Sequence, residues 1–62
     1  MNDARFDKAV RLWLEAGEYK DGRPVLGKKA RLERYREAAA AAPDGYAGLV
    51  EELTRRKLIT WA

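Results

Sequence analysis

Few side chains in this sequence are suited to catalysis. The 62 residues contain no histidine, cysteine or serine, so the candidate nucleophiles reduce to threonines, tyrosines and lysines with no imidazole to act as their base. A carboxylate or a lysine does acid–base work at neutral pH only when burial in a cleft shifts its pKa. A chain of this length has little room for a cleft. We therefore expect no catalytic residues and a protein that is not an enzyme in its own right.

The acidic residues and the glycines do not form a recognisable ligand site either. Asp44, Glu51 and Glu52 offer oxygen ligands, but they lack the alternating acidic loop of a calcium site. Glycines 17, 22 and 27 fall at intervals of five, a spacing that matches neither the dinucleotide fingerprint nor the phosphate loop. We expect no metal and no cofactor, and we assign these glycines to turns and helix ends.

The basic residues are concentrated in the middle of the chain. The net charge is +3, whereas residues 20–36 alone carry seven Lys or Arg against two Asp or Glu, a net of +5. Such a segment is either a solvated helix face or a surface that meets phosphates. The second interpretation assigns nucleic-acid binding to Lys20, Arg23, Lys28, Lys29, Arg31 and Arg34.

A helix, a break at 42–45 and a further helix also suggest helix-turn-helix DNA binding. The last helix would then enter the major groove. Glu51 and Glu52 are expected on its outward side, where their charge would repel phosphates. This weighs against ordinary helix-turn-helix docking.

The aromatic residues favour a protein partner. Six large rings, at positions 6, 13, 19, 35, 46 and 61, are many for so small a core. Tyr, Trp and Arg are enriched at the energetic centres of protein interfaces. We assign protein binding to Trp13 and Tyr35 as anchors, with charge supplied by Arg31, Arg34 and Arg36. The alternative is that the aromatics simply enlarge a small core.

Three amphipathic segments must position these residues, at 3–16, 28–42 and 45–57. Asn2 or Asp3 is placed to cap the first helix, Gly17 ends it, and Asp44 is placed to cap the third. Helical spacing predicts which residues of each segment face the core. They are Phe6, Val10 and Trp13 in the first segment, Leu32, Tyr35, Ala39 and Ala42 in the second, and Tyr46, Leu49, Val50 and Leu53 in the third. Glu51–Arg55 and Glu52–Arg56 are expected to pair on the outer face of the third helix.

Between the first two helices, Asp21-Gly22 predicts a hairpin-like loop, although Pro24 argues against a regular ladder. The β-branched and aromatic residues at 58–61 predict a short strand or an extended arm. The expected fold class is mainly α: one small three-helix domain, residues 1–62, with a hairpin-like loop between helices 1 and 2 and a short extended C-terminal tail.

The leading hypothesis is a cytoplasmic, non-enzymatic protein that attaches to a larger protein with an acidic or mixed-charge surface and modulates or inhibits it, as compact adaptors and phage or plasmid inhibitors do. The alternative is a small basic regulator that binds DNA or RNA as a dimer. A homo-oligomer is a third possibility, because a chain this short buries a marginal core. The start of the sequence is not a secretory signal, and no stretch has the length of a membrane span.

Overall fold

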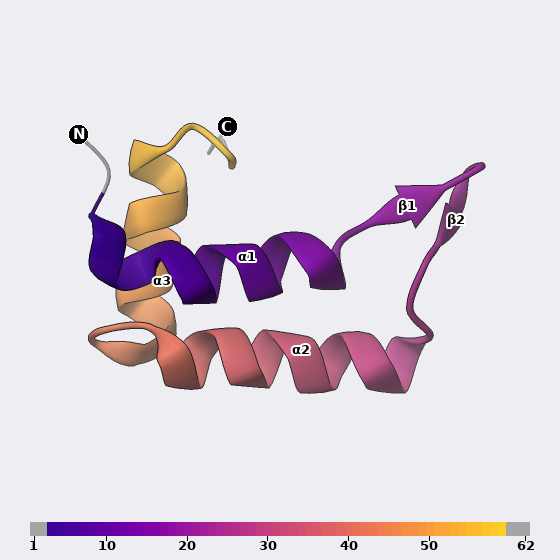
Figure 1. The fold of residues 1–62 in the computed structure, drawn as a ribbon, viewed down its shortest axis with the longest axis horizontal. Coiled ribbons are helices and arrows are strands. Elements are labelled where there is room, and N and C mark those ends of the chain that lie inside the picture. The colour runs from indigo at the N-terminus through magenta and orange to yellow at the C-terminus, as the bar shows by residue number, and fades with distance from the viewer. Residues whose placement is uncertain (1–2, 60–62) are drawn as a thin grey trace.

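The computed structural model describes residues 3–59 and is mainly helical (Figure 1). Its elements are a 3-10 turn η1 (Ala4–Phe6), α1 (Asp7–Ala16), β1 (Tyr19–Lys20), β2 (Arg23–Pro24), α2 (Lys28–Ala41) and α3 (Gly45–Arg55). The predicted fold class is confirmed, with three helices and a two-stranded hairpin between the first two. Residues 58 and 59 lie in neither helix nor strand. The rest of the predicted tail, including Trp61, lies outside the described residues.

The first helical segment begins and ends at the predicted signals. The carboxylate of Asp3 accepts the backbone amide of Arg5 at 3.0 Å, so Asp3 caps η1, which leads into α1. Asn2, the other predicted cap, lies outside the described residues. At the other end α1 stops at Ala16, and Gly17 follows as its C-cap.

The hairpin is built on the Asp-Gly dipeptide. Asp21 and Gly22 have φ values of 54° and 77°, and positive φ at both central residues is what a tight two-residue hairpin turn requires. The strands pair antiparallel, with Tyr19 opposite Pro24 and Lys20 opposite Arg23. Pro24 has no amide to donate, and the ladder is only two residues long on each side. The hairpin extends away from the helices (Figure 1).

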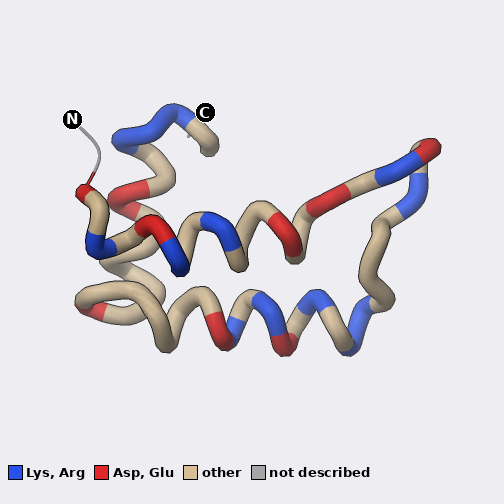
Figure 2. Tube along the Cα trace, in the orientation of Figure 1, with Lys and Arg blue, Asp and Glu red and all other residues tan. Residues whose placement is uncertain are grey.

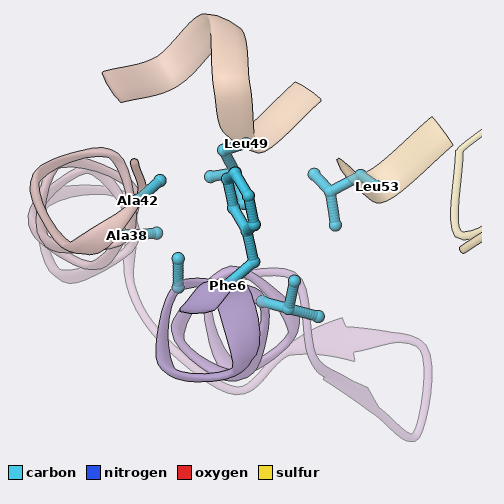
Figure 3. Packing of buried hydrophobic residues seen from close by; sticks show 7 residues of the cluster. Phe6, Ala38, Ala42, Leu49 and Leu53 are labelled. Carbon is cyan, nitrogen blue, oxygen red and sulfur yellow. The ribbon is translucent and has the colours of Figure 1, made fainter. Parts of the chain in front are cut away.

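The helices form an antiparallel pair with a third helix at one end. α1 and α2 lie side by side, and α3 stands at the end where α1 begins and α2 finishes (Figure 1). The core fills the space between the three and consists of Phe6, Ala9, Val10, Ala38, Ala42, Leu49 and Leu53. Phe6 projects from the start of the chain toward Leu49, beside the alanines of α2 (Figure 3). These small alanines allow the other helices to approach α2 closely.

The side of α2 that faces the core is rotated about the helix axis relative to the predicted one. Leu32 is 51% exposed, and Tyr35 and Ala39 are only partly buried, whereas Ala38 is fully buried. Only Ala42 of the predicted set is buried. The physical reason is that α1 packs closely on the smallest side chains of α2. The larger apolar residues of α2 then lie beside this contact and are not within it.

The predicted inner face of α3 is also rotated. Leu49 and Leu53 are buried as expected, but Tyr46 is 57% exposed and Val50 is half-buried. The side of α3 that turns inward instead carries Gly48 and Glu52, and Glu52 is 0% exposed. Glu52 was expected on the outer face, so this is a correction as well.

The start of α3 differs from the predicted cap. Asp44 precedes the helix, but its φ is 62° and its side chain makes no capping hydrogen bond. The left-handed backbone lets the chain reverse sharply after α2. It also brings the Pro43 carbonyl so close to Gly48 that a Cβ atom at position 48 would collide with it. Glycine at this position is therefore a steric requirement of the α2–α3 turn.

Candidate functional site

The most buried polar group of the described residues is the carboxylate of Glu52. Its Oε2 accepts the Asp3 amide at 2.9 Å and Nε of Arg56 at 2.8 Å. Its Oε1 accepts Nε and Nη2 of Arg55 at 2.9 and 2.7 Å. Arg56 continues the cluster, since its Nη2 donates to the Asp3 carbonyl at 3.0 Å and to Oδ1 of Asp7 at 2.9 Å. Every oxygen of the buried carboxylate is therefore satisfied.

This cluster holds the fold together and is not suited to proton transfer. The Asp3 amide, followed by the Arg56 guanidinium, lowers the pKa of Glu52 to about 2, against the opposing effect of burial. A carboxylate with such a pKa stays ionised at neutral pH and is a poor general base. The cluster fastens the first described residues to α3.

Sequence reasoning missed the burial of Glu52, although a signal for it exists. At 100° per residue, Gly45, Gly48 and Leu49 fall on the same side of the helix as Glu52. Two glycines on one helix face indicate close approach by another segment, so a charge between them is expected to be buried and paired. The burial also corrects the argument against helix-turn-helix docking, which counted Glu52 as outward; only Glu51 of that pair is exposed.

The two predicted protein-binding anchors lie on one side of the α1–α2 pair. Trp13 is partly buried and packs against the core cluster, on the side of α1 that carries Phe6 and Val10. Tyr35 is also partly buried, and its hydroxyl oxygen lies 3.6 Å from where a Cβ of Gly17 would be. Helical spacing places Gly17 on the same side of α1 as Val10. Both aromatic rings therefore lie on the side of the pair on which α3 packs.

On this side α3 packs on the end of the helix pair away from the hairpin, and within residues 3–59 no other helix packs on the end nearer the hairpin. α3 stands at the end away from the hairpin (Figure 1), where it packs on Phe6, Ala38 and Ala42 (Figure 3). Leu32 lies one helical turn before Tyr35 in α2, which is nearer the hairpin, and its side chain is half exposed. We call the surface formed by Trp13, Leu32 and Tyr35 the open face.

The three predicted arginines do not converge on this surface. By helical spacing Arg31 lies about 40° from Tyr35 and Arg36 about 40° from Leu32, so these two flank the open face. Arg34 lies about 100° from Tyr35 by helical spacing, further from the open face, and pairs with Glu37 at 3.1 Å. Arg31 is half-buried, and its buried Nε has no hydrogen-bond partner among residues 3–59. Sequence reasoning did not single out Leu32 as a binding residue.

Of the predicted nucleic-acid set, Lys20 and Arg23 lie in the hairpin strands and Lys28 and Lys29 in the first turn of α2, while Arg31 and Arg34 lie further along that helix. Figure 2 shows Lys and Arg on both hairpin strands and along the first half of α2. Lys20 and Arg23 lie directly opposite each other in the hairpin, so their side chains share one face of it. Lys28 and Lys29 begin α2, where the helix dipole disfavours positive charge. Like charges opposite each other in a hairpin are also unfavourable. These four cations therefore lie where neither the helix dipole nor the pairing across the hairpin stabilises positive charge.

A shallow groove of about 400 Å³ runs between α1 and α2 on the side away from the open face. It is lined by Lys8, Leu12, Glu37, Ala40 and Ala41. Within residues 3–59, no group of three or more acidic side chains is placed to hold a metal ion. None of the helices described has the length and apolar character needed to cross a membrane.

Comparison with known proteins returns no matching family model, no matching curated relative and no matching solved structure.

Proposed function

We propose that this protein is a non-enzymatic binding module of the cytoplasm that attaches to a larger protein and modulates or inhibits it. The observation that supports this most directly is the open face: helical spacing places Trp13 and Tyr35 on the side of the helix pair on which α3 packs, and Leu32, one helical turn from Tyr35 toward the hairpin, is 51% exposed. Trp and Tyr are enriched at the energetic centres of protein interfaces, and the exposed side chain of Leu32 adds apolar surface to them.

The surrounding charge supports an acidic or mixed-charge partner. Arg31 and Arg36 flank the open face, and residues 20–36 have a net charge of +5. Charge of this kind steers association with a partner of the opposite sign and fixes its orientation. Arg34 contributes less, because Glu37 already pairs with it.

Affinity capture with two matched variants tests the proposal. Leu32→Glu places a charge on the open face, and Ala40→Glu makes a similar change at an exposed position beside the groove on the opposite side. We expect a protein from a nuclease-treated lysate to be retained by the wild type and by A40E and to be lost with L32E. Equal retention by both variants would show that the open face is not the binding surface.

A second candidate function, a nucleic-acid-binding regulator, is supported by the paired cations of the hairpin. Lys20 and Arg23 face the same way at the tip of an exposed, projecting element. Phosphate contacts would offset their mutual repulsion and would make the affinity fall steeply with salt.

Charge reversal separates this candidate from the first. Lys20→Glu with Lys28→Glu is expected to abolish binding to a DNA or RNA duplex, while Lys8→Glu with Arg11→Glu, the same charge change on α1, preserves it. Equal effects of the two pairs would indicate an unspecific dependence on net charge. A dimer in sedimentation experiments, together with no binding of nucleic acid and no protein retained from the lysate, would instead support the homo-oligomer.

A further inference from the structure

We infer that the open face receives an acidic amphipathic helix of the partner protein, which packs across α1 and α2 beside α3. This inference rests on the proposed function and adds the chemistry and shape of the binding segment. Three features of the described residues carry it: the space beside α3, the apolar row on α2 and the placement of charges around that row.

The space beside α3 has the width of one helix. α2 has 14 residues and is therefore roughly 21 Å long, at about 1.5 Å per residue. Packed helices lie about 8–10 Å apart, so α3 occupies about half of this length. The part of α2 from Lys28 to Tyr35 spans roughly 10 Å. A second helix thus fits next to α3 on the same side of the pair.

The apolar row on α2 continues beyond the part that the protein itself covers. Ala42, at one end, is buried beneath α3; Ala39 and Tyr35 are partly buried; and Leu32 is 51% exposed. The spacing of these residues is that of one continuous helix stripe. The exposed fraction of these side chains therefore increases from Ala42 to Leu32, which is the direction away from α3. A helix with apolar residues at three- and four-residue intervals would complete this burial.

The charges around the row favour a negative helix. Lys28 precedes Leu32 by one turn, and Arg31 and Arg36 flank the row on either side. The acidic residues of α2, Glu33 and Glu37, fall about 100° or more away from the row by helical spacing. The buried Nε of Arg31 has no partner among the described residues, and a carboxylate from the partner is a suitable acceptor.

The same charges argue against the other occupants. A second copy of this chain, packed face to face, would bring Lys28, Arg31 and Arg36 against their own counterparts. A nucleic acid backbone would meet these cations but would leave Leu32 without an apolar contact. An acidic amphipathic helix satisfies both the row and its flanks.

Site-specific crosslinking tests the inference directly, because the chain has no cysteine. Leu32→Cys, labelled with a benzophenone maleimide, places a photoreactive group on the open face, and Ala40→Cys places the same group on the opposite side. Arg36→Cys, at an exposed position beside Leu32, is a second probe of the open face that does not disturb the apolar row. The labelled proteins are irradiated in a lysate of the cells that produce the protein, and the crosslinked peptides are identified by mass spectrometry.

The expected result is one protein segment that crosslinks at positions 32 and 36 and not at position 40. The segment has a net negative charge and apolar residues at helical spacing. A synthetic peptide of that segment should become helical on binding and lose at least about tenfold in affinity when Leu32 is replaced by serine. Its affinity should also fall with added salt.

Other outcomes overturn the inference in distinguishable ways. A crosslinked protein segment that is neutral, basic or non-helical refutes the acidic helix but leaves the proposed function standing. Crosslinks to a second copy of the chain or to nucleic acid refute both. No enrichment of any protein at positions 32 and 36 over position 40 refutes both as well.

Discussion

The carboxylate of Glu52 accepts a hydrogen bond from the backbone amide of Asp3 at 2.9 Å, although 49 positions separate the two residues in the chain. Arg56, one turn further along, donates to the carbonyl of the same Asp3 at 3.0 Å. The backbone amide of Asp3 is thus bound by Glu52 in the last turn of α3, and its carbonyl by Arg56, the C-cap of the same helix. These polar contacts add to the apolar contacts of Leu49 and Leu53 that hold α3 on the α1–α2 pair.

Replacing Glu52 with glutamine should destabilise the protein strongly. The amide of the new side chain would place a donor among the Asp3 amide and two guanidinium groups, all of which are donors themselves. Arg56, whose side chain is only 12% exposed, would then lose one of its two carboxylate partners. Thermal melting followed by circular dichroism measures the effect. Glu51→Gln, the same change at the exposed neighbour, is the control, and equal melting temperatures for the two variants would contradict the structural role of Glu52.

Stability should depend on acid in a defined pH range. The pKa of Glu52 is lowered from 4.5 to about 2 in the folded protein, so its contribution is complete above pH 4.5 and is lost as the pH falls toward 2. Asp3 behaves similarly, because its hydrogen bonds with Arg5 lower its pKa from 3.8 to about 2. Urea midpoints measured from pH 7 to pH 2 should be level above about pH 5 and fall below it. In Glu52→Gln the urea midpoint should fall less steeply with pH, and the remaining fall should be the contribution of Asp3. An unchanged dependence on pH would assign the acid sensitivity to other groups.

The elements that local sequence signals specify were predicted well. Asp21-Gly22 predicted the hairpin because few residues tolerate positive φ at two successive positions. Asp3 predicted the first cap because its side chain reaches an amide two residues ahead. Such features depend on neighbours in the chain, so the sequence alone contains most of the information that determines them.

The faces of α2 and α3 were predicted only in part, with Ala42, Leu49 and Leu53 buried as expected, because these faces depend on which helices meet. Leu32 and Tyr35 are the largest apolar residues of α2, and hydrophobicity alone turns them inward; the close contact is made by Ala38 and Ala42 instead. Glu52 was placed outside because a charge normally prefers water, whereas Asp3 and two arginines compensate its burial. Among the predicted site residues, helical spacing places Trp13 and Tyr35 on the same side of the helix pair, while Arg34 pairs with Glu37.

Lys57→Gly should stabilise the protein by about 0.5–1 kcal/mol. Lys57 has a φ of 61°, a left-handed conformation that disfavours residues with a Cβ. It follows the C-cap of α3, where the Leu58 amide donates to the Leu53 carbonyl at 2.9 Å and the Lys57 amide to the Thr54 carbonyl at 3.0 Å. These are the two bonds of the helix-terminating motif in which glycine is preferred. Urea denaturation measures the gain, and Lys57→Ala, which removes the side chain but keeps the Cβ, should show none of it.

Gly48→Ala should destabilise the protein by at least about 1–3 kcal/mol, the range for overpacking a tight site. Helix propensity alone predicts the opposite sign, since alanine in place of glycine within a helix usually gains about 1 kcal/mol. In this protein the new Cβ would collide with the Pro43 carbonyl oxygen and lie 3.1 Å from Cβ of Asp44. Both contacts are in the turn that joins α2 to α3, so relief requires α3 to move away from Phe6 and Ala42. Gly17→Ala is the matched control, because its Cβ would have only ordinary contacts, the nearest 3.6 Å from the Tyr35 hydroxyl. Equal or greater stability of Gly48→Ala in urea denaturation would mean that the α2–α3 turn is looser than the structure shows.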